Sequence, residues 1–303
     1  MKRIFLCGAL LCTYAISNAC TICGCSAANQ YLGILPQSNN HFIGLQYQYR
    51  AFESTHTDEP ASSQLSKEYY QTVQLWGRYS IGKRLQLFAF VPYIYNRQEE
   101  PTASNSIIGL GDISLLANVR LLGLYDDCGK WNHKLQAGGG IKLPTGSYNN
   151  TSVTTQEGLP NMQPGTRSWD FIVNANFTVS RDRIGANVDA SYTLTTVNPS
   201  NYKYGNRFSA GLLCYYQYKL SSLRLIPQAG LRTDVAGSDY DNYSYRWKND
   251  MSGGYQVYSS IGIQAYYKKI GLQAMYHLPV VQHYARGLVT AKSKTEAGIY
   301  LLF

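Results

Sequence analysis

The amino-acid sequence predicts an all-β protein: a transmembrane antiparallel β-barrel of about twelve strands, preceded by a signal peptide. Apolar and polar residues alternate along most of the chain, as in strands that have one face in lipid and the other in a lumen. The only continuous apolar run lies at the N-terminus, so any other span must be a strand. Tyrosine accounts for 27 of the 303 residues, against 9 phenylalanines, and its amphipathic ring suits the aromatic girdles of a barrel.

The alternation is clearest between residues 184 and 194. Ile184, Val188 and Tyr192 share an apolar face, whereas Asn187 and Asp189 lie on the polar one. The same two-residue period recurs along the chain, which favours an even number of strands of similar length. The predicted strands cover residues 41–52, 68–80, 84–97, 107–122, 132–145, 168–180, 183–197, 204–219, 222–236, 253–267, 270–283 and 290–303.

The connections between predicted strands alternate between short and long. Barrels of the outer membrane have short periplasmic turns and long external loops, so both termini are expected in the periplasm. For the long loop 146–167 two alternatives remain, an inward-folded constriction or a mobile segment. Pro92, Pro227 and Pro279 fall inside predicted strands, where the missing N–H predicts bulges or strand ends. Short turns are predicted at 82–83, 181–182, 220–221 and 268–269, and long loops at 53–67, 98–106, 146–167, 198–203 and 237–252.

Residues 1–19 are expected to be a signal peptide. Lys2 and Arg3 precede an apolar stretch over residues 4–16, and the small residues before position 20 suit cleavage after Ala19. The stretch is shorter than the roughly 20 residues that a membrane-spanning helix needs. Residues 20–40 are then a periplasmic N-terminal segment, of which residues 26–40 either enter the barrel as a plug or lie beneath it, and residues 41–303 form the outer-membrane barrel.

A soluble β-sandwich would also alternate, but two observations favour the barrel. The apolar faces have comparable lengths in nearly every predicted strand, whereas those of a sandwich would vary. The sequence also ends in an alternating strand with Phe303 as its last residue, which is the mark that the barrel-assembly machinery recognises. The expected location is therefore the bacterial outer membrane, with outer-membrane lipid and the assembly machinery as partners.

Two short motifs, one predicted strand apart, resemble signatures of a known family. Gly109-Leu110-Gly111-Asp112 begins one strand, and Leu143-Pro144-Thr145-Gly146 ends the next. The chain is similar in these motifs to the outer-membrane "transporter" family related to the phenol meta-cleavage-pathway proteins, over about residues 85 to 303. This resemblance implies a barrel that passes small hydrophobic or aromatic compounds.

Cys20-Thr21-Ile22-Cys23-Gly24-Cys25 departs from the pattern of that family. Three thiolates within six residues suit a soft metal ion such as Cu(I) or Zn as a cofactor, bound by Cys20, Cys23 and Cys25. Two alternatives remain open. The cysteines form disulfides in an oxidising compartment, for example with Cys128, or Cys20 carries a lipid.

The polar face of the predicted strands carries charged residues that would line the lumen. Two interpretations are equally compatible with this pattern: a basic lumen that selects anions, or interior charges that pair with one another. Asp112, which lies among glycines, is expected to pair with a neighbouring arginine. The candidate lumen and selectivity residues are Asp112, Arg120, Lys134, Lys142, Asp189, Arg207, Arg224, Arg232 and Asp234.

The leading hypothesis is passive or facilitated transport of a small solute across the outer membrane. A metal-handling protein that uses its N-terminal cysteines, and a structural or adhesion barrel that acts through its loops, are the alternatives. The net charge of +9 is scattered, which disfavours nucleic acid as a partner. His277 faces the lumen by parity, but no serine motif accompanies it, and we expect no enzyme and no catalytic residues.

Overall fold

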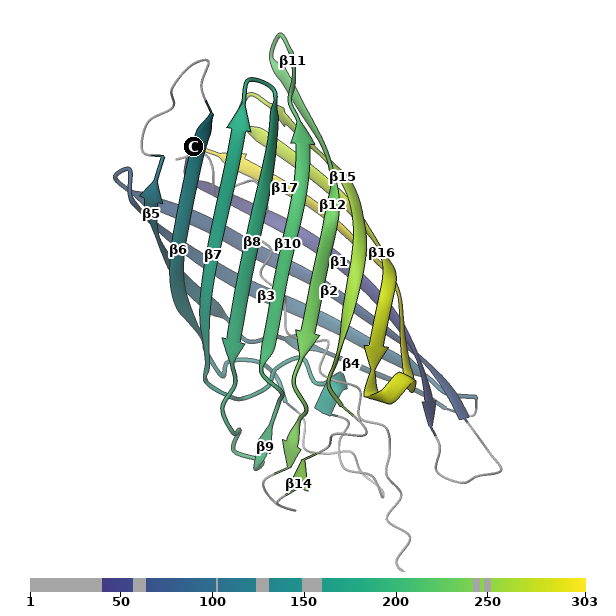
Figure 1. Cartoon of the computed structure of the whole chain (residues 1–303). Helices are drawn as coiled ribbons and strands as arrows, with labels where there is room; N and C mark the ends of the chain where they lie inside the picture. Colours follow the sequence, from purple (N-terminus) through teal and green to yellow (C-terminus); the bar gives the residue numbers. More distant parts are fainter. Residues whose placement is uncertain are drawn as a thin grey trace, which may run out of the picture.

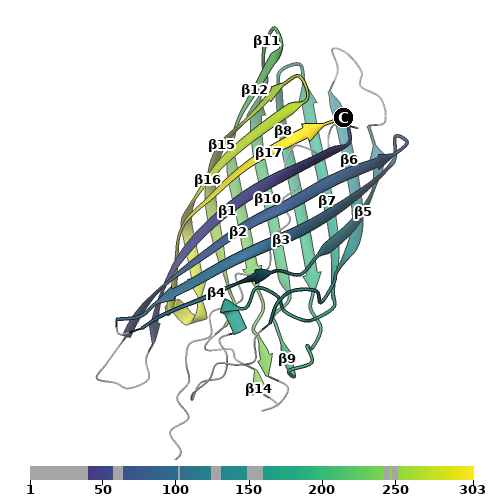
Figure 2. The same cartoon turned by 180° about the vertical axis from the view of Figure 1, so that it is seen from behind.

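The computed structural model describes residues 40–56, 64–101, 103–123, 131–148, 160–241, 246–247 and 252–303. These residues form a closed antiparallel barrel, as the alternation predicts (Figures 1 and 2). The first strand, β1, pairs with the last, β17, so the sheet has no free edge. Fourteen strands make up the sheet, but β4 and β5 share one passage and β10 and β11 another, which leaves twelve crossings.

The strands match the predicted ranges closely, apart from the first hairpin, which is longer. The prediction ended the first strand at residue 52 and began the second at 68, whereas β1 reaches His56 and β2 begins at Gln64. The barrel strands are β1 (Phe42–His56), β2 (Gln64–Ile81), β3 (Leu85–Glu99), β4 (Ser104–Leu110), β5 (Ser114–Leu122), β6 (Asn132–Lys142), β7 (Asp170–Arg181), β8 (Ile184–Leu194), β10 (Arg207–Tyr216), β11 (Tyr218–Leu220), β12 (Leu223–Ala236), β15 (Gly254–Tyr267), β16 (Ile270–Tyr284) and β17 (Val289–Leu302).

The two ends of the barrel differ, and we call them the turn end and the loop end. The turn end carries the tight connections at 82–84, 182–183, 221–222 and 268–269, together with the C-terminus (Figure 1). Each of these turns begins with a residue of positive φ, between 49° and 60°. The loop end carries a small sheet and two 3₁₀ turns: β9 (Tyr202–Lys203), β13 (Tyr240–Asp241), β14 (Arg246–Trp247), η2 (Pro160–Met162) and η3 (Ala285–Gly287).

The three predicted strand prolines all lie at interruptions of the hydrogen-bond ladder. Pro92 of β3 lies opposite the gap between β4 and β5. Pro227 of β12 lies opposite the gap between β10 and β11, and Pro279 of β16 lies at a bulge of its own strand, where Val280 is the extra residue opposite Val257 and Tyr258 of β15. The expectation of bulges or strand ends at these positions is confirmed, because proline has no N–H to donate.

The two faces of the barrel wall differ as the alternation predicts. Large apolar side chains such as Leu75, Val173 and Ile261 are exposed on the outer face. Most side chains on the inner face are polar and buried, for example those of Gln48 and Asn187. Within the described ranges, no helix is both long and apolar enough to cross a bilayer.

Candidate functional site

The lumen holds most of the predicted charged residues, at different depths. Among the carboxylates and cations of the prediction, one cluster forms on β8 and β12 and another near the loop end on β6. Arg224 is exposed at the turn end, where its guanidinium lies 5.6 Å from the ring centre of Tyr266. The side chains of Asp112, Arg120, Lys142, Asp189, Arg232 and Asp234 are buried, and those of Lys134 and Arg207 are half-buried.

Arg232 is the centre of the first cluster. Its Nη1 lies 3.3 Å from Asp189 Oδ2, and its Nε lies 3.7 Å from Asp234 Oδ1. Ser209, on the strand between them, accepts a hydrogen bond from Arg232 Nη2 and donates one to Asp234. The arginine can cross β10 to reach Asp189 because Gly211 has no side chain in the way: a Cβ there would lie 2.8 Å from Asp189 Oδ1.

Asp112 is the centre of the second cluster, and it pairs with a lysine rather than with the arginine expected from the sequence. Lys142 Nζ lies 3.4 Å from Asp112 Oδ2 and also contacts Asp170. Asp112 Oδ1 accepts a hydrogen bond of 2.9 Å from the N–H of Gly146, and Oδ2 accepts two of 2.7 Å from the N–H and hydroxyl of Thr166. Asp112 pairs with the lysine because β6, which carries Lys142, is the strand next to β5. Lys142 is also the register partner of Asp170 across β6 and β7.

These contacts explain the two sequence motifs at residues 109–112 and 143–146. Gly111 and Asp112 occupy the break between β4 and β5, and the N–H of Ile113 donates to Thr145 Oγ1 at 2.9 Å. Gly146 packs against Gly165 so closely that a Cβ on either would clash with the other. The motifs therefore fasten two neighbouring strands to the segment 160–168, which follows them in the chain.

Residues 160–168, which we call the inward loop, fold into the barrel at the loop end. Of the two alternatives for the loop 146–167, residues 160–167 adopt the inward one, and every residue of the inward loop except Arg167 is buried. Asn96 donates to the carbonyl oxygen of Met162 at 2.8 Å, and Asn161 donates to the Tyr70 hydroxyl at 3.4 Å. The Met162 side chain packs in a buried group that also contains Phe52, Tyr70, Tyr284 and Val289.

Tyr204 supports the inward loop from the other side. Its hydroxyl donates to the Pro160 carbonyl at 2.9 Å, and complete burial raises the pKa of the phenol well above its usual value. The group therefore stays protonated and remains a donor. The consecutive strands β3, β2, β1, β17 and β16 all contribute to the contacts of the inward loop, which therefore occupies part of the mouth beside these strands.

A third group of charges in the lumen was not predicted from the sequence. On β17, Lys294 Nζ lies 2.7 Å from Glu296 Oε1, and Gln46 of β1 donates to Glu296 Oε2. His277 of β16 lies nearby, with Nδ1 2.7 Å from the Ser260 hydroxyl. The alternation of β17 could have predicted that Lys294 and Glu296 face the lumen, since they lie on the same face of the strand as the inward Tyr300.

Ser260, His277 and Glu296 resemble the order of a hydrolytic triad, but the second link is weak. His277 Nε2 lies 3.6 Å from Glu296 Oε1, and that same oxygen makes the shorter contact with Lys294. A base must be oriented by its acidic partner, which here is engaged by another cation. We therefore interpret the group as part of the buried ion network.

The inner face also carries an aromatic patch that alternation did not predict. Phe42, Trp76, Phe88, Phe90 and Tyr300, from β1, β2, β3 and β17, form this patch, and each is at most 3% exposed. The Trp76 ring lies 4.7 Å from that of Phe42 and 5.8 Å from that of Phe90. The missed signal is a loss of alternation: residues 87–91 of β3 are apolar on both faces.

The aromatic patch lies next to buried cations. The Arg78 guanidinium lies 5.1 Å from the ring centre of Phe42, and it donates through Nε to the Asn40 carbonyl at 3.0 Å. Arg120 is close enough for the two positive charges to repel each other. This part of the barrel interior therefore combines buried aromatic rings with positive charge.

The cysteine predictions lie mostly outside the described residues. Cys20, Cys23, Cys25 and Cys128 fall there, so the metal, disulfide and lipid alternatives stay predictions, as does a plug formed by residues 26–40, of which only Asn40 is described. Cys214 is exposed on the outer face, as its parity predicts. In the part of the chain that the structure describes, no three histidine, cysteine, aspartate or glutamate side chains are grouped to hold a metal ion.

Comparisons with known proteins place the chain. The solved structure of the COG4313 outer membrane channel from Pseudomonas putida F1 is similar to it, with a TM-score of 0.64 and 14% identity over 88% of this chain and 96% of that one. The beta domain of the Bordetella autotransporter BrkA is similar with a TM-score of 0.50 and 12% identity, over 88% of this chain and 100% of that one. No curated protein matches the sequence.

The two structural similarities establish the fold, which is that of outer-membrane β-barrels. The sequence itself matches the family model described as "Putative MetA-pathway of phenol degradation" over residues 52–271, a range that contains both motifs, the inward loop and most barrel strands. Since this match covers well over half of the chain, the protein belongs to the Putative MetA-pathway of phenol degradation family, as the resemblance in its motifs predicted.

Proposed function

We propose that the protein is a channel of the bacterial outer membrane that carries a small, apolar or aromatic solute by passive or facilitated transport. In this orientation the turn end, where the described chain begins at Asn40 and where the C-terminus lies, faces the periplasm, and the loop end faces outward. The similarity to an outer membrane channel and the family's link to phenol degradation support this class of function. Transport of this kind requires binding of the solute in the lumen and no chemical reaction.

The aromatic patch is the observation that carries the proposal. A lumen that passed only ions or sugars would be best lined by polar groups, since each exposed apolar ring costs contact with water. Here five aromatic residues on the inner face pack against one another near the periplasmic end, each at most 3% exposed, in place of the polar side chains found elsewhere on that face. Stacked or edge-on contact with such rings favours a flat apolar solute by roughly 0.5–1.5 kcal/mol per ring pair.

The inward loop gives the channel its selectivity by size. It narrows the external mouth through contacts with strands on both sides of the first hairpin, so a solute must pass beside Met162. Methionine is flexible and polarisable, and it adapts to apolar solutes of different shape. A narrow mouth followed by an aromatic wall is suited to slow, selective passage of small molecules.

Single-channel conductance of the refolded full chain in a planar bilayer, with phenol as the probe solute, tests the proposal. We expect stable current steps that phenol partly blocks. The variant Trp76→Ala with Phe90→Ala should keep the steps and lose about tenfold in sensitivity to phenol, as expected for loss of roughly 1.4 kcal/mol of binding.

Trp131→Ala is the matched control, because this tryptophan is half exposed and lies beside Arg181 at the turn end, away from the aromatic patch. It should behave like the natural protein. A correctly folded barrel that conducts no current would contradict the channel. Equal phenol sensitivity in the two variants would contradict the aromatic patch as its binding surface.

A further inference from the structure

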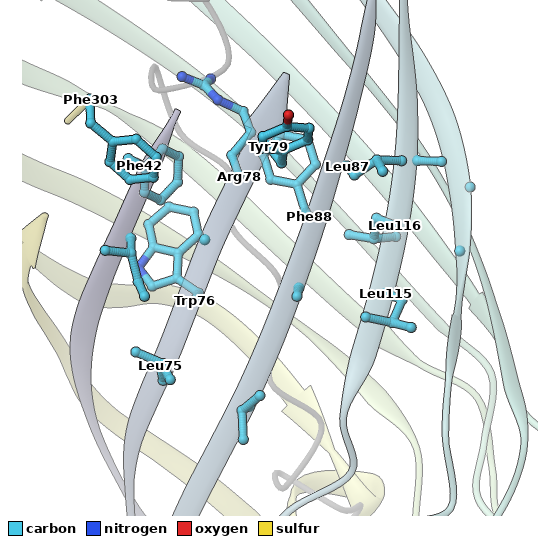
Figure 3. A pocket seen from close by; sticks show the side chains of 17 residues that line it. Phe42, Leu75, Trp76, Arg78, Tyr79, Leu87, Phe88, Leu115, Leu116 and Phe303 are labelled. Atoms are coloured by element: carbon cyan, nitrogen blue, oxygen red, sulfur yellow. The ribbon is translucent and has the colours of Figure 1, made fainter. Parts of the chain in front are cut away.

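A groove lies on the outer face of the barrel, opposite the aromatic patch of the lumen. Its volume is about 610 Å³, and it crosses β2, β3, β5 and β6 (Figure 3). The inward side chains behind it, such as Trp76 and Phe88, are 3% and 2% exposed, whereas Leu75, Leu87 and Leu115 are between 38% and 43% exposed. The accessible surface of the groove therefore belongs to the outward residues, and the groove opens toward lipid.

Small residues make the floor of the groove. Gly77 and Ala89 are register partners across β2 and β3, and Ala117 and Gly139 are register partners across β5 and β6. The larger Leu75, Leu87 and Leu115, which Figure 3 labels, lie beside them as walls on β2, β3 and β5. The groove is therefore an apolar furrow in an outer surface that is otherwise covered by leucine and tyrosine side chains, and it is wide enough for a hydrocarbon chain.

The turn end of the groove has the composition of a membrane–water interface. His41 stacks on Tyr79 with ring centres 4.7 Å apart and on Phe303 at 5.6 Å. Rings of this kind mark the headgroup level of a bilayer. The turn that follows Tyr79 carries two exposed cations, Lys83 and Arg84, which are positioned beyond the apolar part of the groove.

We infer that the groove is a binding site for one phospholipid of the periplasmic leaflet, with an acyl chain on the Gly77–Ala89–Ala117–Gly139 floor and the phosphate at Lys83 and Arg84. The apolar floor, the aromatic cluster and the basic turn follow one another in the order of acyl chain, glycerol level and phosphate. The complementarity of the cations and the phosphate favours a phospholipid over a neutral solute. This inference rests on the outer-membrane placement proposed above, but not on channel activity.

Native mass spectrometry of the full chain in a neutral detergent tests the site, with dioleoyl phosphatidylethanolamine as the probe. Ala89→Leu with Ala117→Leu fills the floor and should weaken binding of the first lipid by about tenfold. Ala229→Leu is the control, because Ala229 faces outward on β12, on the far side of the barrel. It should leave the first lipid in place.

The phosphate is tested separately. Lys83→Ser with Arg84→Ser should weaken binding of the phospholipid and not that of dioleoylglycerol, which has the same chains without the phosphate. Lys268→Ser with Lys269→Ser, in the turn between β15 and β16, is the matched control. Both groove variants should keep single-channel conductance. If the natural protein also conducts no current, the proposed transport is contradicted, but the lipid-binding site is not.

Three results would overturn the inference. Lipid binding that is unchanged in the filled-floor variant would remove the groove as its site. Binding of dioleoylglycerol that is as tight as binding of the phospholipid would contradict recognition of the phosphate by the basic turn. A dimer that forms through the natural groove and is lost on filling it would assign the groove to a second copy of the chain.

Discussion

Glu68 lies near the loop end of β2, farther from the turn end than the roughly 9–11 residues that a strand needs to cross a bilayer. The first hairpin projects at this end (Figure 2). Burial raises the pKa of the Glu68 carboxyl to about 7, although Ser54, Ser66 and Tyr70 donate hydrogen bonds to it. Because the folded state holds the proton more tightly than the unfolded state, ionisation costs stability as pH rises from about 4.5 to about 7.

Glu68→Gln removes this cost, since the amide stays neutral at every pH. We expect the variant to be more stable than the natural protein at pH 8, by about 1–3 kcal/mol, and equally stable at pH 4. Urea unfolding of the folded barrel in detergent at the two pH values measures the difference. Glu53→Gln is the control, because Glu53 lies on the same hairpin as Glu68 and forms a half-exposed ion pair with Lys292 of β17. A gain that is the same at both pH values would show that ionisation of Glu68 is not its origin.

Gly211 is a second residue whose role can be measured. A Cβ at this position would lie 2.8 Å from Asp189 Oδ1 and 3.3 Å from Arg232 Nη1. Gly211→Val should therefore push Arg232 away from Asp189 and cost up to about 3–5 kcal/mol, the usual penalty for breaking a buried pair. The unfolding free energy in urea measures this, with Gly237→Ala as the control, where the nearest atom lies at an ordinary 3.4 Å. Equal stability of the two variants would contradict a role for the glycine in this ion pair.

At the level of elements, the inward loop is held mainly by Asp112. Asp112→Asn keeps the shape of the side chain but removes the charge that pairs with Lys142, and Thr166→Val removes the hydroxyl donor to the same carboxylate. Both changes should release the inward loop and raise single-channel conductance several-fold. Asp182→Asn, in an exposed turn at the opposite end, should leave conductance unchanged. Release of the loop without any rise in conductance would show that the narrow point lies elsewhere in the lumen.

The inward loop also marks the limit of prediction from sequence. Strands could be predicted because alternation is a local signal, and Pro92, Pro227 and Pro279 marked the breaks for an equally local reason. The position of the inward loop depends on partners far away in the chain: Asn161 and Tyr70 are 91 residues apart. The Asp112 motif could be found, but its role could not, because Thr166 lies beyond the next strand and follows no periodicity.

On the scale of the whole molecule, the wall of the barrel was more predictable than its lumen. Lipid imposes one requirement on every outward residue, so alternation is regular there. The lumen imposes several: ion pairs at Arg232 and Lys294, a constriction at Met162 and the aromatic patch around Trp76. A residue such as Phe88, apolar and inward, breaks the two-residue pattern because it serves the solute path and not the membrane.

The charges of the lumen predict how the channel selects ions. Among the described residues, the buried inward-facing cations are nearly balanced by carboxylates, and Arg232, Lys142 and Lys294 each pair with at least one. Half-buried Lys134 and Arg207 and exposed Arg224 add positive charge nearer the mouths. The buried cations are Arg78, Arg120, Lys142, Arg232 and Lys294, and the buried carboxylates are Glu68, Asp112, Asp170, Asp189, Asp234 and Glu296, with Asp239 in the connection after β12.

We therefore expect weak anion preference at low salt that disappears at high salt, since exposed charges are screened within about 3 Å at 1 M and about 10 Å at 0.1 M ionic strength. Reversal potentials across a potassium chloride gradient, measured at both mean concentrations, test this. Arg224→Ser with Lys134→Ser should abolish the low-salt preference, whereas Lys268→Ser at a turn outside the lumen should not. A strong anion preference that persists at 1 M salt would mean that buried cations such as Arg78 and Arg120 act on the solute directly, and the lumen would then be an anion-selective path, not a balanced one.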